Sequence, residues 1–237
     1  CKRSGFNAMC LTVDTVVAGN RERDHKWGFT TPPKLTLKSL LSFALHPKWS
    51  INYLTHKKFE LANVSHFTKK GSSIAKGVME YINEQYDPRM GWKDAEYCIK
   101  KWGGPFAIKG VMSVEDAKRA VQIGASAIML SNHGGRQLDG SRAPFDQLPA
   151  IADAVGGKVE IIVDGGIRRG THVLKALSLG ATACSFGKGY LFGLGAGGQK
   201  GVEAVLQKMH DEIRRDMILL GCKSIKDLNK SNVAFRS

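Results

Sequence analysis

Two side chains with useful chemistry lie three positions apart in the stretch 131–136, which reads Ser-Asn-His-Gly-Gly-Arg. His133 can accept a proton near neutral pH, and Arg136 can hold a carboxylate through two parallel hydrogen bonds. The glycines between them let the backbone turn tightly or approach a ligand. A base beside a carboxylate clamp indicates chemistry next to the carboxylate of a small organic acid. The same residues would also suit a surface turn, so the elements around them must decide.

Short apolar runs alternate with helical patterns along the chain. Strands are predicted over 6–14, 105–109, 125–130, 159–164 and 181–186, and helices over 35–45, 49–59, 92–102, 113–123, 145–155 and 169–179. A long last helix carries an apolar stripe from Val202 to Leu220 and ends at Gly221. Strands that are apolar throughout and alternate with helices are typical of a parallel sheet covered by helices. Because no GxGxxG follows the first strand, we expect an α/β fold of the (β/α)8 barrel type, with five of the eight strands present.

Size and composition favour an ordinary globular chain with an uneven charge. The 237 residues suffice for one domain or at most two, no apolar run has the length of a membrane span, and no signal peptide is recognisable. The five cysteines are scattered without metal-type spacing, which indicates reduced thiols on the cytosolic side and no metal site. The net charge is +14, and residues 31–71 contain seven lysines against the single acid Glu60.

Polar residues follow each predicted strand, where a barrel places its functional groups. The strand ends carry Asp14, Lys109, the 131–136 stretch, the run 164–170 and the run 187–189. A lysine in a barrel mouth is suited to stabilising developing negative charge. Asp14 opposite His133 could orient an imidazolium, as carboxylates do in other sites that use histidine.

The last two strand ends predict a phosphate site. Gly165 and Gly166 free backbone N–H groups just before a helix begins, and Arg168 and Lys188 add positive charge. Barrels often hold a phosphate between the loops after strands seven and eight.

These motifs together resemble those of the FMN-dependent 2-hydroxy acid dehydrogenases and oxidases, a family that includes glycolate oxidase, L-lactate dehydrogenase and (S)-mandelate dehydrogenase. The resemblance covers nearly the whole chain. It rests on 131–139 (SNHGGRQLD), 11–15 (LTVDT), 19–24 (GNRERD), 109–111 (KGV) and 164–170 (DGGIRRG). It identifies the chain, 1–237, as the C-terminal part of a single barrel domain with strands 4–8 of the eight.

The resemblance also implies roles for the site residues. His133 is the catalytic base and Asp14 pairs with it, while Lys109 lies by the flavin ring and stabilises its reduced form. Arg136 binds the substrate carboxylate and Arg21 lies near the substrate. The remaining residues contact FMN: Thr12 and Ser131 at the flavin, Asp164 at the ribityl chain, and Gly165, Gly166, Arg168, Gly187 and Lys188 at the phosphate.

The chain departs from the family pattern in two places. Lys188 stands where the family has Arg, so the charge is kept and the planar fork is lost. Val16 stands where Pro is common. The family's substrate-binding tyrosines lie upstream of Cys1, so we expect the fragment alone to hold FMN poorly. The resemblance implies a homo-oligomer, a tetramer in this family.

The basic stretch 32–71 follows the fourth barrel strand and carries aromatic and aliphatic side chains between its lysines. One interpretation is an insertion that meets anionic lipid, because that composition suits an interfacial segment. The other is a mobile loop that covers the active site. The first interpretation places the protein in the cytoplasm, peripheral on the cytoplasmic face of the inner membrane.

The predicted function is FMN-dependent oxidation of an L-2-hydroxy acid, of the L-lactate or (S)-mandelate type, to the 2-keto acid. The acceptor of the electrons is a quinone, a cytochrome or oxygen, and the base takes either the hydroxyl or the Cα proton. One alternative is another FMN- or phosphate-binding barrel oxidoreductase. One type of these enzymes needs a catalytic cysteine, and in this sequence no cysteine lies at a strand end of the site. Another is a fragment that acts only as a basic binding module. Nucleic acid is not expected as a partner.

Overall fold

The computed structural model describes residues 1–22, 26, 36–56, 81 and 84–235. These residues form two compact units, one made of 1–15 and 89–237 and the other of 16–88. Each unit is described by itself below.

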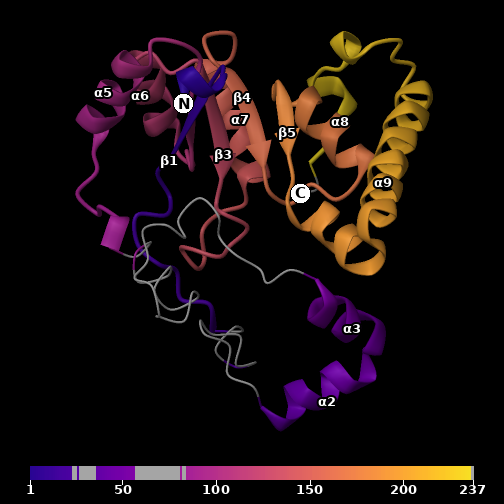
Figure 1. Cartoon of the computed structure of the whole chain (residues 1–237). Helices are drawn as coiled ribbons and strands as arrows, with labels where there is room; N and C mark the ends of the chain where they lie inside the picture. The colour runs from indigo at the N-terminus through magenta and orange to yellow at the C-terminus, as the bar shows by residue number, and fades with distance from the viewer. Residues whose placement is uncertain (23–25, 27–35, 57–80, 82–83, 236–237) are drawn as a thin grey trace. The chain divides into compact units, whose positions relative to one another are not determined.

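The first unit is built on a five-stranded parallel sheet (Figure 1). The strands are hydrogen-bonded in chain order, so each lies beside the strand that follows it in sequence. They are β1 (Met9–Thr12), β2 (Phe106–Lys109), β3 (Ala127–Ser131), β4 (Glu160–Asp164) and β5 (Ala183–Ser185). Sequential order with parallel pairing throughout is the arrangement of a (β/α) barrel wall and not of a doubly wound sheet.

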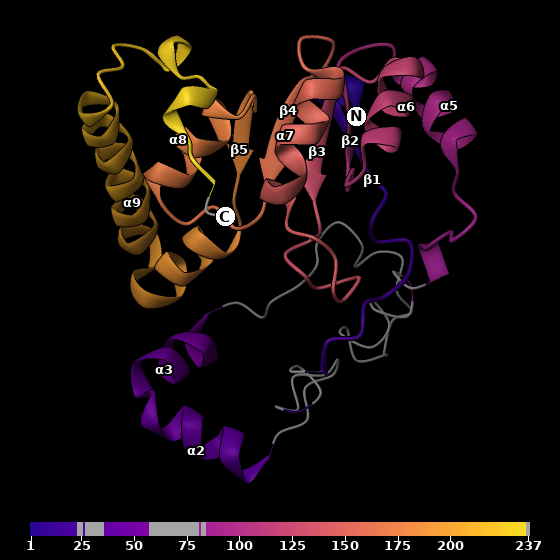
Figure 2. The ribbon, with the colours of Figure 1, turned by 180° about the vertical axis from the view of Figure 1, so that it is seen from behind.

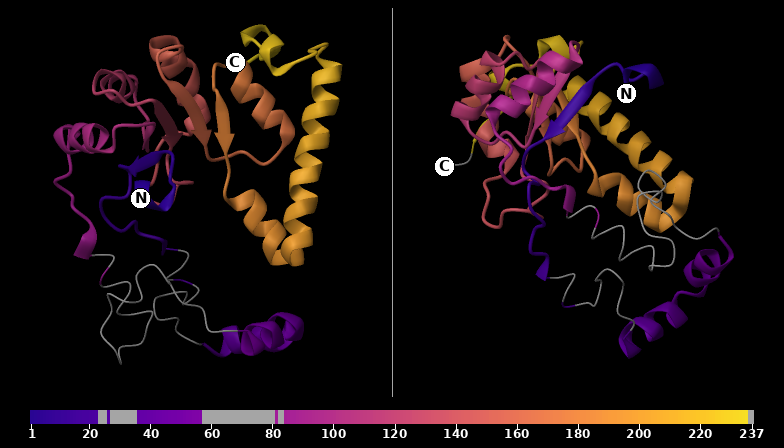
Figure 3. Two further views of the ribbon diagram at one scale, coloured as in Figure 1. Left: turned by 45° about the horizontal axis from the view of Figure 1, so that its top comes forward. Right: turned by 60° about the vertical axis from the view of Figure 1, so that its left-hand side comes forward.

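Helices follow the strands and cover one face of the sheet. Figure 2 shows α7 in front of β3 and β4, against which it packs. The views in Figures 1 and 3 agree that α8 lies between β5 and α9. The helices of this unit are α5 (Trp92–Trp102), α6 (Val114–Gln122), α7 (Pro144–Val155), α8 (Gly170–Ser178) and α9 (Lys188–Leu219), with short 3₁₀ turns η1 (Lys2–Ser4), η3 (Ile225–Asp227) and η4 (Lys230–Asn232).

Burial alternates along the strands and separates two faces. Phe106, Ile108, Ile128, Leu130, Ile161 and Val163 are fully buried under the helices. The residues between them, such as Ala107, Met129 and Ile162, are only half-buried. Successive strand residues point to opposite faces, so the second face, which would be the barrel interior, carries the alternate positions. The site residues described below lie on this inner face.

Most predicted elements are confirmed, with shifted ends. The first strand is four residues long because Phe6 is exposed and does not join the sheet. Ser131 belongs to β3 and is buried, although the predicted strand stopped at residue 130. Ser113 caps α6, since its Oγ accepts a hydrogen bond from the backbone N–H of Asp116 at 3.1 Å.

The last helix was predicted too short. α9 begins at Lys188, before the apolar stripe, and bends at Gly197 and Gly198. Glycine has low helix propensity, so the glycine-rich first part gave no helical pattern. A Cβ on Gly193 would lie 2.7 Å from the carbonyl oxygen of Gly201, so only glycine permits the two parts of α9 to approach so closely.

The second unit contains α2 (Leu37–Leu45) and α3 (Pro47–Thr55). Thr36 caps α2, because its Oγ1 accepts a hydrogen bond from the N–H of Ser39 at 3.2 Å. The helix predicted over 49–59 corresponds to α3, and its residues 57–59 lie outside the described residues, as do 32–35 and 60–71 of the basic stretch. Within the described ranges, we find no helix with both the length and the apolar character needed to cross a bilayer.

Candidate active site

Three polar side chains meet on the inner face at the carboxyl ends of β2, β3 and β4. Lys109 Nζ donates to Ser131 Oγ at 2.8 Å and lies 2.8 Å from Asp164 Oδ2. Ser131 Oγ donates to the same carboxylate oxygen at 2.8 Å. Ser131 and Asp164 are register partners in the sheet, and Lys109 occupies the same face one strand away. The network therefore follows directly from strand register and the two-residue period of the side chains.

The charge of Asp164 is held by its neighbours. Burial disfavours the carboxylate, but hydrogen bonds from Lys109, Ser131 and Ser185, together with the charge of Lys109, outweigh it and hold the pKa of Asp164 below its ordinary value. Asp164 is therefore ionised at neutral pH, and Lys109 and Asp164 form a fixed ion pair at the mouth of the sheet.

The loop after β3 holds His133 in an unusual backbone conformation. His133 has φ +56°, and among the described residues it is the one residue other than glycine with a positive φ. Gly134 and Gly135 continue the left-handed turn, and Asn132 Oδ1 accepts a hydrogen bond from the N–H of Gly134 at 3.0 Å. The N–H of His133 donates to Ser131 Oγ at 3.1 Å. Strain of this kind is characteristic of functional sites.

Asp14 lies against the imidazole of His133, as the sequence predicted. His133 Nδ1 is 3.4 Å from Asp14 Oδ2. Both atoms are buried, and within the described part of the chain neither has a hydrogen-bond partner. Buried polar atoms are normally satisfied. A carboxylate that faces an imidazole can stabilise the positive charge that the imidazole gains when it accepts a proton.

Gly110 sets the position of Asp14, which gives a testable consequence. Gly110 has φ +104°, and a Cβ at this position would lie 2.7 Å from Asp14 Cβ. We expect Gly110→Ala to move Asp14 away from His133 and to lower both the free energy of unfolding, by about 2 kcal/mol or more, and the rate of turnover. Urea denaturation and steady-state kinetics of the full-length protein measure the two effects.

The matched control is Gly140→Ala, because Gly140 has φ +72° and open space around the added Cβ. It should cost about 1–2 kcal/mol of stability for the left-handed backbone and leave turnover unchanged. Equal losses of activity in the two variants would contradict the assigned role of Gly110.

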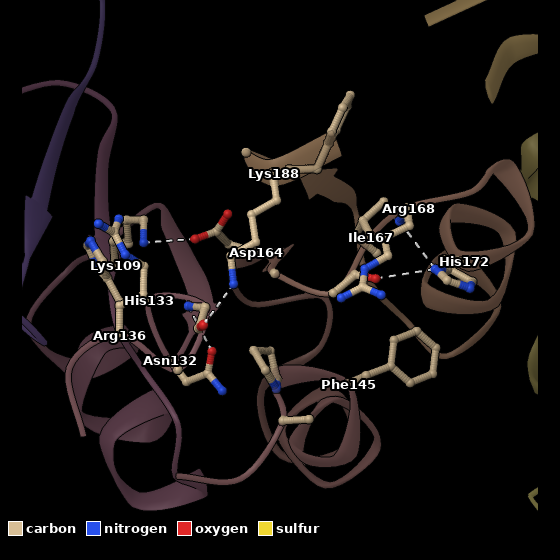
Figure 4. Close-up of a pocket in the computed structure, with 18 of the residues that line it drawn as sticks. Lys109, Asn132, His133, Arg136, Phe145, Asp164, Ile167, Arg168, His172 and Lys188 are labelled. Carbon is tan, nitrogen blue, oxygen red and sulfur yellow. Dashed lines mark hydrogen bonds and ion pairs between the residues drawn. The ribbon is translucent and has the colours of Figure 1, made fainter. Parts of the chain in front are cut away.

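A pocket of about 750 Å³ opens beside this network, a size typical of ligand sites (Figure 4). Its lining includes nine of the predicted site residues: Lys109, His133, Arg136, Asp164, Gly165, Gly166, Arg168, Gly187 and Lys188. Lys109, the base, the carboxylate clamp and the predicted phosphate residues thus share one cavity, although they come from four different strand ends.

The far end of the pocket is basic and glycine-rich. Gly165 and Gly166 have φ values of +114° and +75°, and a Cβ on Gly166 or Gly187 would meet no atom within 4 Å. Arg168, Lys175 and Lys188 line this end, and Lys188 Nζ donates to the carbonyl oxygen of Gly134 at 3.2 Å. Exposed turn backbone surrounded by cations is an arrangement that binds phosphate.

Four predicted residues lie beside the pocket or apart from it. Thr12 is the register partner of Lys109 on the inner face, Ser131 lies beneath the pocket within the network, and Asp14 is behind His133. Arg21 belongs to the second unit, so its role near the substrate stays a prediction.

Sequence reasoning missed several residues of the site. Ser185 joins Asp164 from the neighbouring strand, and its position two residues before Gly187 could have placed it on the inner face. His172 and Lys175 line the pocket from α8. Phe145 and Leu191 add apolar lining.

The cysteines offer no nucleophile at this site. Burial raises the pKa of Cys184 to about 11. Burial also raises the pKa of Cys10, against the influence of nearby Lys109. The thiolate is the reactive form of cysteine. Neither Cys10 nor Cys184 is therefore suited to act as the nucleophile of a barrel enzyme that depends on a catalytic cysteine. Among the described residues, no group of three or more His, Cys, Asp or Glu is placed to hold a metal ion.

Comparison with known proteins gives a consistent result. A family model described as FMN-dependent dehydrogenase matches residues 1–235. An L-lactate oxidase from Nostoc sp. is 41% identical over 228 residues, which cover 96% of this chain and 57% of that protein. An L-lactate dehydrogenase from Xanthomonas campestris pv. campestris is also 41% identical, over 96% of this chain and 59% of that protein.

Solved structures agree with the sequences. The crystal structure of the monotopic membrane protein (S)-mandelate dehydrogenase matches with a TM-score of 0.89 and 34% identity, over 97% of this chain and 60% of that chain. A lactate oxidase from Pediococcus acidilactici matches with a TM-score of 0.72 and 34% identity, over 99% of this chain and 56% of that chain.

The chain thus spans somewhat more than half the length of the proteins it matches, and its open five-stranded sheet is part of the (β/α)8 barrel that was predicted. The matched family model takes in the pocket, the His133–Asp14 pair and the Lys109–Asp164 network. The chain belongs to the family of FMN-dependent 2-hydroxy acid dehydrogenases and oxidases.

Proposed function

We propose that the complete protein oxidises an L-2-hydroxy acid to the corresponding 2-keto acid with FMN as cofactor. The observation that carries the proposal is the pairing of a strained His133 with the buried carboxylate of Asp14 in a pocket that Arg136 also lines. Relatives named L-lactate oxidase, L-lactate dehydrogenase and (S)-mandelate dehydrogenase support the same class of reaction.

The residues present fit FMN. The glycine turn at 165–166 and Gly187 leave backbone open where a Cβ would otherwise stand, and Arg168 and Lys188 supply charge for the phosphate. Asp164 would accept from hydroxyls of the ribityl chain, with Lys109, Ser131 and Thr12 near the ring. When bound, FMN supplies a two-electron acceptor.

Each site residue then has a defined task. Arg136 binds the carboxylate of the substrate, and the role of Arg21 near the substrate stays a prediction. His133 removes a substrate proton through Nε2, since its Nδ1 faces Asp14. Asp14 stabilises the imidazolium that forms.

The relatives include an oxidase and flavocytochrome b2. Oxygen, a cytochrome or a quinone is therefore the proposed class of electron acceptor. Assembly into a homo-oligomer stays a prediction.

The carboxylate requirement gives a direct experiment. The full-length, FMN-loaded protein is mixed without oxygen with L-lactate or (S)-mandelate and, separately, with the corresponding 2-hydroxy amides, and the flavin absorbance is followed. The acids should bleach the flavin and the amides should not, because Arg136 recognises a carboxylate. Equal bleaching by an acid and its amide would contradict the proposed clamp.

We also propose that the 32–71 segment contacts a lipid surface, which would make the protein peripheral on the cytoplasmic face of the membrane. Its described helices, α2 and α3, bury no residue and contain no acidic side chain. Phe43, Trp49 and Tyr53 stack in a row, with ring centroids 5.4 and 5.3 Å apart. Exposed aliphatic side chains surround them: Leu37, Leu40, Leu41, Leu45, Ile51 and Leu54. Apolar helices with lysines and an aromatic row suit an interface with anionic lipid.

Replacing one exposed leucine should weaken this contact. Leu45→Asp removes roughly 1.5–3 kcal/mol of apolar burial in lipid, so we expect binding to anionic vesicles to weaken about ten- to a hundredfold. Co-sedimentation of the full-length protein with vesicles measures this. Leu219→Asp in α9 is the matched control, because Leu219 is also 78% exposed. If both substitutions weaken sedimentation equally, the segment is not the contact surface.

A further inference from the structure

His172 occupies a position in the pocket that neither the motifs nor the proposed reaction explains. It lies in the first turn of α8 and lines the basic end of the pocket (Figure 4). Its Nδ1 is 3.3 Å from the backbone nitrogen of Arg168 and 3.3 Å from the carbonyl oxygen of Gly166. One imidazole nitrogen therefore contacts a donor and an acceptor of the same turn.

These two contacts require opposite protonation states of Nδ1. A neutral imidazole with a bare Nδ1 accepts from the N–H of Arg168. An imidazole that carries a proton on Nδ1 donates to Gly166 and can no longer accept from Arg168. A proton on Nδ1, which the imidazolium always carries and the neutral ring carries in one of its two tautomers, thus decides whether the Arg168 N–H is used inside the turn or is available to a ligand.

One neighbouring backbone N–H is already occupied. The first helical N–H of α8, that of Gly170, already donates to the buried Glu212 Oε2 at 2.8 Å, and Arg169 Nη1 is 3.2 Å from Glu212 Oε1. The helix terminus is therefore closed by a carboxylate from α9. A phosphate in the pocket would meet the turn 165–168 and not the helix end.

Charged groups around His172 come from every element that packs near it. They are Arg168 and Arg169 in the turn, Lys175 on α8, Lys188 and Glu212 on α9, and the Asp164–Lys109 pair on the sheet. Glu212 is engaged with Arg169 and Gly170, and Asp164 with Lys109. A phosphate dianion bound among these groups would favour a positive charge on the imidazole.

We propose that His172 is a proton-linked binding residue for the cofactor phosphate. On phosphate binding, its Nδ1 takes a proton from solvent, donates to Gly166 and releases the Arg168 N–H to the phosphate. This inference rests on the proposed FMN function and deepens it. The sign follows from linkage: the complex favours protonated His172, so the added affinity is present at lower pH and is lost as the pH rises.

Calorimetry of FMN binding to the full-length protein in two buffers of different ionisation enthalpy measures the protons taken up. We expect the wild type to take up more protons with FMN than His172→Asn does, by a difference approaching about one near neutral pH. Asparagine keeps a polar group near the Nδ1 position but does not titrate. The ionisation of the phosphate itself is common to both proteins and cancels in the comparison. Riboflavin, which lacks the phosphate, should show no such difference.

His210→Asn is the control, since His210 lies exposed on α9 and pairs with Asp211; it should behave as the wild type. Nitrogen-15 NMR of His172 in the wild type, with and without FMN, is a second test that needs no variant and should show both ring nitrogens protonated when FMN is bound, and not a switch between the two neutral tautomers. Equal proton uptake by wild type and His172→Asn, or an unchanged His172 spectrum, would overturn the inference while FMN binding stands. Failure of the folded wild-type protein to bind FMN would instead refute the proposed function.

Discussion

Replacing His133 by alanine in the full-length protein should slow the reduction of bound flavin by a 2-hydroxy acid about 10²–10⁴-fold, the range that a positioned general base contributes. FMN should stay bound, because His133 is placed for substrate and the basic turn lies at the other end of the pocket. Anaerobic stopped-flow absorbance gives the rate of reduction, and the visible spectrum of the purified variant gives the FMN content.

The matched control for this variant is His210→Ala on the exposed face of α9. It should reduce flavin at the wild-type rate. A His133→Ala variant that reduces flavin normally would show that another group removes the proton. A variant that loses FMN would show that His133 acts in cofactor binding.

Lys109→Met should have the second large effect, because it leaves the carboxylate of Asp164 without its cation. The two side chains are only 19% and 18% exposed, and breaking such a pair by removing one partner costs on the order of 3 kcal/mol in the free energy of unfolding. Urea denaturation of the full-length protein at pH 7 measures the loss. Lys100→Met is the matched control: Lys100 and Glu96 are 73% and 41% exposed, so solvent screens the pair and its loss should be much smaller than that of Lys109→Met.

The pH dependence separates the charge effect from a packing effect. In the wild type the pKa of Asp164 is lowered, so its contribution to stability is present above the ordinary carboxyl pKa and is lost as the pH falls through the folded-state pKa. Without Lys109, burial dominates and favours the protonated acid. The stability deficit of Lys109→Met should therefore shrink as the pH falls, and Asp164→Asn should relieve most of it. A deficit that is constant with pH would indicate lost packing.

The parts of the site that follow from strand periodicity were predictable from the sequence. Thr12, Lys109, Ser131 and Asp164 end successive strands, and parallel pairing in chain order brings their side chains to one face. Position 110 needs glycine because Asp14 approaches its backbone closely. The glycines at 134 and 135 suit the left-handed turn that follows β3. Local pattern and tertiary position agree at these residues.

The residues that sequence reasoning missed depend on contacts between elements far apart in the chain. Glu212 lies 42 positions from Gly170, whose N–H it accepts, and a charged residue on an apolar stripe gave no indication of that partner. His172 is the third residue of α8, and its role depends on the turn folding back over it. The first part of α9 was missed because its glycines have low helix propensity, so this helix depends on tertiary contacts that the sequence pattern does not show.

The most direct test of the proposed activity is a single anaerobic turnover of the full-length, FMN-loaded protein with L-lactate or (S)-mandelate and with the opposite enantiomer. The flavin absorbance and the 2-keto acid formed are measured together. The account predicts one molecule of 2-keto acid for each flavin bleached by an L-2-hydroxy acid, and no bleaching by the opposite enantiomer. An FMN-loaded protein that no 2-hydroxy acid bleaches would contradict it.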